Sequence, residues 1–230
     1  MKYQHLFFDL DHTLWDFDKN SEATWLVLYD RYQLAAIGIP DFKEFFRVYN
    51  IHNDRLWERF RNRFIKREEL RWKRIWLTLL DFKVPDTKLA HELSYAYLEL
   101  LPTQQALMPY AKEILDHCKD RYALHLITNG FEATQWQKLQ HAGIADYFKE
   151  VITSEKSNSM KPYPEIFEYA LQITGAQASG SLMIGDALDI DVLGAFNAGW
   201  DQVYYNPHRK AHDRQPTFEI ANLEELVRVL

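Results

Sequence analysis

The chain has 230 residues, of which 47% are hydrophobic and 26% are charged, and its formal net charge is −6. This composition excludes a disordered or fibrous chain, and the acidic balance disfavours general binding to nucleic acid or anionic membranes. A single cysteine, Cys118, allows no internal disulfide, and we find neither a signal-peptide layout nor an apolar stretch long enough to span a membrane. We therefore expect a cytoplasmic protein with one large domain, or with a domain and an insertion.

Residues 3–10 are mostly apolar and end in Asp-Leu-Asp, which predicts a short buried strand. From residue 17 to residue 105 the pattern of apolar residues changes. Large apolar residues recur there at the i, i+3, i+4 and i+7 spacing of a helix, as in the stripe that begins at Trp25. Three prolines punctuate this region, so we predict a block of four or five helices.

After Pro109 the pattern alternates between short strands and helices. The predicted strands cover residues 123–127, 150–153, 181–184 and 202–205, and the predicted helices cover residues 111–119, 132–141, 164–174, 189–197 and 223–229. Such alternation is typical of a mainly parallel sheet with helices on both faces. We predict an α/β fold with a Rossmann-like core of residues 1–16 and 106–230, into which an all-helical domain of residues 17–105 is inserted.

Polar residues follow three of the predicted strands, at the edge where open α/β sheets bind ligands. Asp9 and Asp11 end the first strand, Thr128 and Asn129 end the second, and Asp186 ends a later one. Two carboxylates at this spacing suit a nucleophile and a general acid and base, and carboxylates from separate strands suit Mg²⁺. Taken alone, an Asp-x-Asp pair is more commonly part of a solvated loop or a helix cap.

Two further features point to an anion. The N–H groups and hydroxyl of residues 128–130 form either an anion cradle at a helix start or an ordinary N-cap. Lys161 lies in a segment stiffened by two prolines and offers either a point charge for phosphate or an ordinary surface cation. Asp189 and Asp191 follow Asp186 and also suit the positive end of a helix dipole.

In this order, these pieces resemble the motifs of the haloacid dehalogenase superfamily. Its first motif, Asp-x-Asp-x-Thr, corresponds to residues 9–13, and its second motif, a Ser or Thr at a strand end, corresponds to Thr128. Its third motif corresponds to Lys161, and its fourth, Gly-Asp followed by another acid, corresponds to residues 185–191. The helical insertion looks like the cap domain of that family.

Three segments look more closely like the pyrimidine 5′-nucleotidases of this superfamily, which act on deoxyuridine, thymidine and uridine monophosphates. They are FFDLDHTLWDF, LITNGF with Gln135, Lys138 and Leu139 after it, and KPYPEIF. The resemblance implies a phosphomonoester hydrolase that uses Mg²⁺ and forms an aspartyl phosphate.

The resemblance also implies a role for each motif residue. Asp9 would attack phosphorus, and Asp11 would protonate the leaving oxygen and then deprotonate the hydrolytic water. Mg²⁺ would be held by Asp9, the backbone carbonyl of Asp11 and Asp186. The phosphoryl oxygens would be held by Thr128, the Asn129 amide and Lys161. Asp191 would orient Lys161 or a metal-bound water, and Thr13 would either brace the loop by hydrogen bonding or act as a simple N-cap.

The inserted helices leave several alternatives open. Trp15 and Phe17 are candidates for stacking on a base, and the basic stretch from Arg55 to Arg74 is either an anion-attracting patch or a solvated helix face. A phosphosugar phosphatase or mutase would use the same four motifs, whereas a dehalogenase would not need Asp11. A non-enzymatic binding or regulatory protein would retain the fold without needing the motif residues. We expect a small-molecule phosphomonoester partner, neither nucleic acid nor membrane, and the sequence does not predict the oligomeric state.

Overall fold

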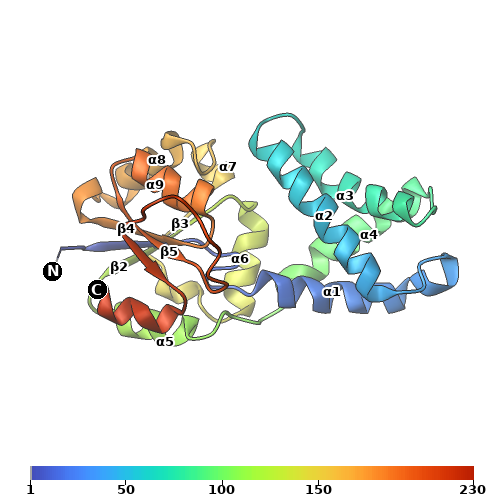
Figure 1. The fold of residues 1–230 in the computed structure, drawn as a ribbon, viewed down its shortest axis with the longest axis horizontal. Coiled ribbons are helices and arrows are strands. Elements are labelled where there is room, and N and C mark those ends of the chain that lie inside the picture. Colours follow the sequence, from blue (N-terminus) through green and yellow to red (C-terminus); the bar gives the residue numbers. More distant parts are fainter. Residues whose placement is uncertain (1) are drawn as a thin grey trace. The chain divides into compact units, whose positions relative to one another are not determined.

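The computed structural model describes residues 2–230, which fold into two compact units (Figure 1). The core unit comprises the segment that ends at Phe17 together with Gln105–Leu230, and the helical unit comprises Asp18–Gln104. No helix among residues 2–230 is both long enough and apolar enough to cross a membrane.

Six strands of the described core unit form one parallel sheet in the order β3-β2-β1-β4-β5-β6. They are β1 (His5–Phe8), β2 (Ala123–Thr128), β3 (Glu150–Thr153), β4 (Ser181–Gly185), β5 (Asp201–Tyr205) and β6 (Phe218–Ile220). Strand β1 is central, and His5 lies opposite Ala123 of β2 and Ser181 of β4. Its apolar residues are buried because helices cover both faces of the sheet.

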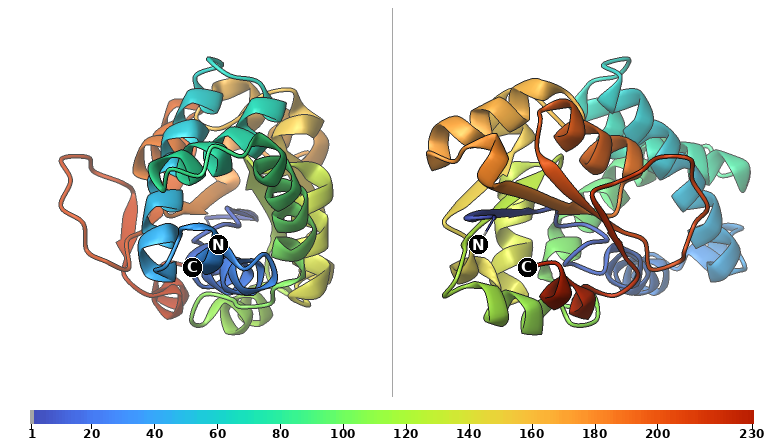
Figure 2. Two further views of the ribbon diagram at one scale, coloured as in Figure 1. Left: turned by 90° about the vertical axis from the view of Figure 1, so that its right-hand side faces the viewer. Right: turned by 60° about the vertical axis from the view of Figure 1, so that its left-hand side comes forward.

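The helices of the core unit lie on both faces of the sheet (Figures 1 and 2). Helices α8 (Pro164–Thr174) and α9 (Leu193–Asn197) cover one face, while α5 (Ala111–Cys118), α6 (Glu132–His141) and a 3₁₀ turn (Leu223–Arg228) cover the other. The core under α8 and α9 consists of fully buried side chains, namely Phe7, Ile127, Ile152, Ile166, Phe167, Ala170, Met183, Ala195 and Trp200. The prediction of a Rossmann-like parallel core is therefore confirmed.

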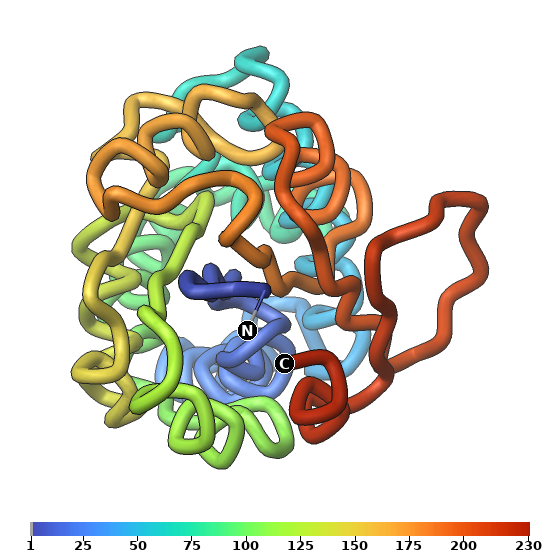
Figure 3. The backbone as a smooth tube through the Cα atoms, turned by 90° about the vertical axis from the view of Figure 1, so that its left-hand side faces the viewer, coloured from blue at the N-terminus to red at the C-terminus, as the bar shows by residue number. Residues whose placement is uncertain are grey.

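Three details of the core unit differ from the prediction. The first strand ends at Phe8, so Asp9 and the residues after it already belong to a turn. The predicted helix of residues 189–197 begins as a π-helical turn (Leu188–Val192), in which the N–H groups of residues 190–192 all reach the carbonyl of Ala187. The sequence pattern did not predict β6, the outer strand of the sheet. The loop of residues 206–217 that precedes β6 extends away from the sheet in Figure 3.

The helical unit contains four α-helices within Asp18–Gln104 and its junction: α1 (Phe17–Arg31), α2 (Phe42–Arg61), α3 (Arg67–Asp81) and α4 (Thr87–Leu100). Asp41 and Asp86 cap α2 and α4 by accepting hydrogen bonds from the first backbone N–H groups. Trp25 lies at the centre of the unit, where its ring contacts those of Tyr49 and Tyr97.

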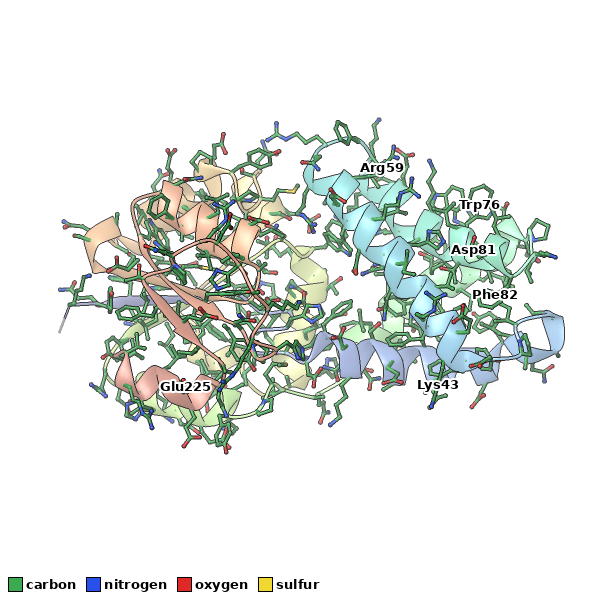
Figure 4. The ribbon with its side chains drawn as sticks, in the orientation of Figure 1. Lys43, Arg59, Trp76, Asp81, Phe82 and Glu225 are labelled. Atoms are coloured by element: carbon green, nitrogen blue, oxygen red, sulfur yellow. The ribbon has the colours of Figure 1, made fainter. Side chains whose placement is uncertain are left out.

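The basic stretch of the helical unit contributes partly to its interior. Arg74 is 5% exposed, donates a hydrogen bond of 2.7 Å to Asn53, and stacks its guanidinium over the rings of Tyr49 and Tyr97. Asp81 lies at the end of α3 (Figure 4). Its Oδ2 is 2.8 Å from Nε2 of His52. The contacts of Arg74 with Asn53, Tyr49 and Tyr97 assign it to packing rather than to an exposed patch.

Candidate functional site

The candidate site lies at the carboxyl ends of β1, β2 and β4, where the strand order reverses beside β1. Asp9 directly follows β1, and its backbone N–H donates to Ile184 of β4 at 2.9 Å. The chain then turns sharply, because the N–H groups of residues 13–15 converge on the carbonyl of Leu10 and His12 adopts a φ of 64°. Asp9 and Asp11 therefore lie in a turn after β1 and not on an extended strand, in which residues i and i+2 point to the same face of the sheet.

Lys161 connects the carboxylates of two separate segments. Its ammonium lies 2.5 Å from Asp9 Oδ1 and 2.6 Å from Asp191 Oδ1, and it donates to the carbonyl of Ile127 at 2.7 Å. Lys161 and Asp191 are each only 1% exposed, so these contacts replace solvation. Asp191 in turn accepts a hydrogen bond of 3.0 Å from the N–H of Ala187, which the π-helical turn brings within reach.

Burial and mutual repulsion dominate the electrostatics of this group. Burial raises the pKa of Asp9 and outweighs the lowering effect of Lys161, and Asp191 and Asp186 raise this pKa further. Burial also raises the pKa of Asp186, again with a contribution from Asp191. Burial lowers the pKa of Lys161, but Asp191 and Asp9 outweigh this effect and leave it above its ordinary value. The carboxylates are therefore incompletely neutralised by the ammonium.

This donor set fits a hard divalent cation. Asp9, Asp186 and Asp191 each place one oxygen within 4.8 Å of the others, and Lys161 is the cation paired with two of them. Thr13 orients Asp186, since its hydroxyl donates to Asp186 Oδ1 at 3.1 Å and accepts from the Asp186 N–H at 3.1 Å. Carboxylate oxygens crowded in this way are the ligands that Mg²⁺ takes in proteins.

Thr128 ends β2 with its hydroxyl held in one orientation. The oxygen accepts hydrogen bonds from the Gly130 N–H at 3.1 Å and from Gln135 Nε2 at 2.7 Å. With two donors on its oxygen, the hydroxyl keeps its own proton for an external acceptor. Gly130 is required here because a Cβ at that position would overlap the Gln135 side chain.

Asn129 joins the second motif to the third. Its side-chain amide donates to the Lys161 carbonyl at 2.8 Å and accepts from the Lys161 N–H at 2.7 Å. The Asn129 side chain is therefore occupied by the backbone that carries Lys161, and its contribution to anion binding is left to its backbone N–H.

Asp11 is bound by two residues of α6 to which the sequence analysis gave no role. Lys138 Nζ lies 2.6 Å from Asp11 Oδ1, and Gln135 Nε2 donates to Asp11 Oδ2 at 3.1 Å. Their i and i+3 spacing, which places both side chains on one face of the helix, was the only signal in the sequence. The structure shows that this face is buried, with Gln135 1% and Lys138 3% exposed.

The two aromatic residues predicted as substrate contacts lie beside Lys138. Its ammonium is 4.4 Å from the centre of the Trp15 ring and 5.6 Å from that of Phe17. Trp15 is fully buried, whereas Phe17 is partly exposed. A contact of either ring with substrate stays a prediction, and exposure makes Phe17 the better placed of the two.

The fold and site define a class of hydrolase, and comparison with known proteins gives its family. The family model of the haloacid dehalogenase-like hydrolases matches the sequence of residues 3–199. The chain is 33% identical to the pyrimidine 5′-nucleotidase PynA of Streptococcus pneumoniae, over 99% of this chain and 94% of that protein. It is 30% identical to the pyrimidine 5′-nucleotidase YjjG of Escherichia coli, over 100% of this chain and 99% of that protein.

A solved structure supports the same assignment. The putative HAD-hydrolase YfnB of Bacillus subtilis, in a crystal form bound to magnesium, aligns with a TM-score of 0.90 at 28% identity, covering 100% of this chain and 99% of that chain. The chain therefore belongs to the haloacid dehalogenase-like hydrolases. The predictions of the superfamily, of an enzyme and of a likeness to pyrimidine 5′-nucleotidases are confirmed.

Proposed function

We propose that this enzyme is a Mg²⁺-dependent phosphatase that hydrolyses pyrimidine nucleoside or deoxynucleoside 5′-monophosphates through an aspartyl phosphate. The observation that carries the proposal is the separation of two carboxylates on one short turn. Asp9 lies among Lys161 and the other acidic groups, while Asp11 is held apart by Gln135 and Lys138. Two carboxylates in different environments suit two different chemical roles.

In the first step, a carboxylate oxygen of Asp9 attacks phosphorus as the bond to the ester oxygen breaks. Asp11 donates its proton to that oxygen, so the nucleoside leaves as a neutral alcohol and Asp9 becomes an acyl phosphate. In the second step, Asp11 takes a proton from water, the water oxygen attacks phosphorus, and inorganic phosphate leaves as the Asp9 carboxylate is restored.

Three groups are proposed to hold the transferred phosphoryl group. The Thr128 hydroxyl has both acceptor positions filled and therefore donates. The Asn129 N–H lies at the start of the loop before α6, and the Lys161 ammonium supplies positive charge. Phosphoryl transfer needs positioning and charge stabilisation more than covalent assistance, which these groups provide.

Mg²⁺ would be held by Asp9, Asp186 and the backbone carbonyl of Asp11, and when bound it would neutralise negative charge on the phosphoryl oxygens. Asp191 keeps Lys161 in place, and Thr13 keeps Asp186 in place. The crowding of these carboxylates and the raised pKa values of Asp9 and Asp186 support the metal.

The substrate class rests on the relatives. PynA and YjjG are pyrimidine 5′-nucleotidases, and each aligns with nearly the whole of this chain, including the helical unit. We propose that the helical unit serves as a cap that admits substrate and excludes water.

The test is phosphate release in the presence of Mg²⁺ from a panel of pyrimidine, purine and sugar monophosphates. We expect turnover of deoxyuridine, thymidine and uridine monophosphates, and none by an Asp9→Asn variant or after addition of a chelator. Preference for a sugar phosphate would refute the substrate class but keep the chemistry. Equal rates for Asp9→Asn and the parent enzyme would refute the nucleophile.

A further inference from the structure

Both oxygens of the Asp11 carboxylate are held by side chains of α6. Lys138 Nζ contacts Oδ1 at 2.6 Å, and Gln135 Nε2 donates to Oδ2 at 3.1 Å. The amide nitrogen of Gln135, and not its oxygen, faces Asp11. The plane of the carboxylate is therefore defined at two points rather than free to rotate about its last torsion.

Lys138 is itself immobilised. Its side chain is 4% exposed, and the rings of Trp15 and Phe17 lie 4.4 Å and 5.6 Å from its ammonium. A buried ammonium needs a charged partner, and Asp11 is the carboxylate that pairs with it. Two aromatic faces add a further attraction for the cation and surround its stem.

Asp11 nevertheless remains reachable, since its side chain keeps 27% of its surface exposed. A group that only stabilised the fold would gain nothing from leaving this carboxylate at the surface of the site. The arrangement instead presents an accessible carboxylate on a buried and rigid support, which is what precise proton transfer requires.

Gln135 links this support to the phosphate-binding hydroxyl. The same amide nitrogen that donates to Asp11 also donates to Thr128 Oγ at 2.7 Å, which uses both of its protons. Gln135 is 1% exposed and packs over Gly130, so its position is fixed by the start of α6.

We propose that Lys138 and Gln135 are positioning residues that hold the Asp11 carboxylate in line with the leaving ester oxygen. Lys138 acts on Asp11 alone, whereas Gln135 acts on Asp11 and on Thr128 together. This inference rests on the proposed function, because it assigns the two residues to the proton donation of that reaction.

The dependence of kcat/KM on the leaving group distinguishes positioning of Asp11 from a purely structural role, which would affect all substrates equally. An alkoxide leaving from a nucleoside monophosphate needs a proton, whereas p-nitrophenolate leaves without one. The ratio kcat/KM covers the steps up to transfer of phosphorus to Asp9, so it reports proton donation and not the later activation of water.

The variants are Lys138→Met and Gln135→Met, which keep approximate side-chain length, with Lys112→Met on the exposed face of α5 as a matched control. For Lys138→Met we expect kcat/KM for thymidine monophosphate to fall about 100-fold, the lower range for general acid catalysis, and that for p-nitrophenyl phosphate to fall less than about tenfold. Gln135→Met should lower both values, because it also releases Thr128. Lys112→Met should change neither.

A double-variant cycle separates positioning from loss of folding. In an Asp11→Asn background, Lys138→Met should add no further difference between the two substrates, because the group that it positions is already absent. Equal losses on both substrates for Lys138→Met, or an additive effect in the Asp11→Asn background, would overturn the inference while leaving the proposed function intact. A parent enzyme that releases phosphate from neither ester would overturn the proposed function, and the inference with it.

Discussion

Removal of the Lys161 charge tests the electrostatic balance of the site. The Lys161→Met variant keeps the length of the buried stem but leaves Asp9 and Asp191 without the ammonium that contacts them at 2.5 Å and 2.6 Å. The loss of one partner from a buried ion pair costs about 3–5 kcal/mol, and the Ile127 carbonyl loses its donor as well. We expect the free energy of unfolding of the core unit to fall by about that amount in the presence of a chelator.

The assay is urea unfolding, with amide exchange in β1 and β4 to report the core unit alone. Lys156→Met is the control, because Lys156 pairs with Glu150 at 3.1 Å while its side chain is 35% exposed, and such pairs contribute about 1 kcal/mol or less. Addition of Mg²⁺ should return part of the stability of Lys161→Met, since the cation binds only the folded carboxylates. A loss below about 1 kcal/mol, or one equal to that of the control, would refute the reasoning.

Three further predictions concern single buried positions. Gly185→Ala should lower the rate of phosphate release at least about tenfold, because the added Cβ would overlap Asp191 Oδ2. Gly180→Ala is the control and should leave the rate unchanged, because a Cβ at residue 180 meets no atom within 4 Å. Equal rates for the two variants would contradict this prediction. Burial lowers the pKa of His125 to about 4, so its contribution to stability is present above about pH 6.5 and is lost as the pH falls towards 4. The free energy of unfolding of the parent enzyme should thus decrease by about 3 kcal/mol over this range, and that of His125→Leu should decrease less. The same pH dependence in both proteins would contradict the assignment of this loss to His125. Cys118 is buried and burial raises its pKa to about 12, so iodoacetamide should modify it only in denaturant, and labelling of the native protein would exclude this environment.

The sheet was predictable because its strands are short apolar runs that end in polar residues. Phe7, Ile127 and Met183 are buried on one face of the sheet as the alternation of elements predicts. Strand β6 was missed because its three residues are too few to form a pattern, and its pairing with β5 depends on tertiary structure.

Asp9, Thr128 and Asp186 were predictable for a different reason, since each lies at the carboxyl end of a strand and parallel strands end at one edge. Lys161 lies eight residues after β3, and its motif rather than its place in the sheet indicated it. The contacts of Asp11 were not predictable in this way. Lys138 and Gln135 lie on α6, and only the packing of that helix beside the first turn shows which carboxylate they reach. The π-helical turn that points Asp191 at Lys161 also lies outside what helical periodicity can indicate.

Capture of the covalent intermediate tests the central claim most directly. The enzyme, Mg²⁺ and thymidine monophosphate would be mixed, quenched rapidly and treated with borohydride, which reduces an acyl phosphate to an alcohol. Peptide mass spectrometry should then find homoserine in place of Asp9, and unmodified aspartate at Asp11 and Asp186. Rapid phosphate release without modification of Asp9, or with modification of another carboxylate, would contradict the account.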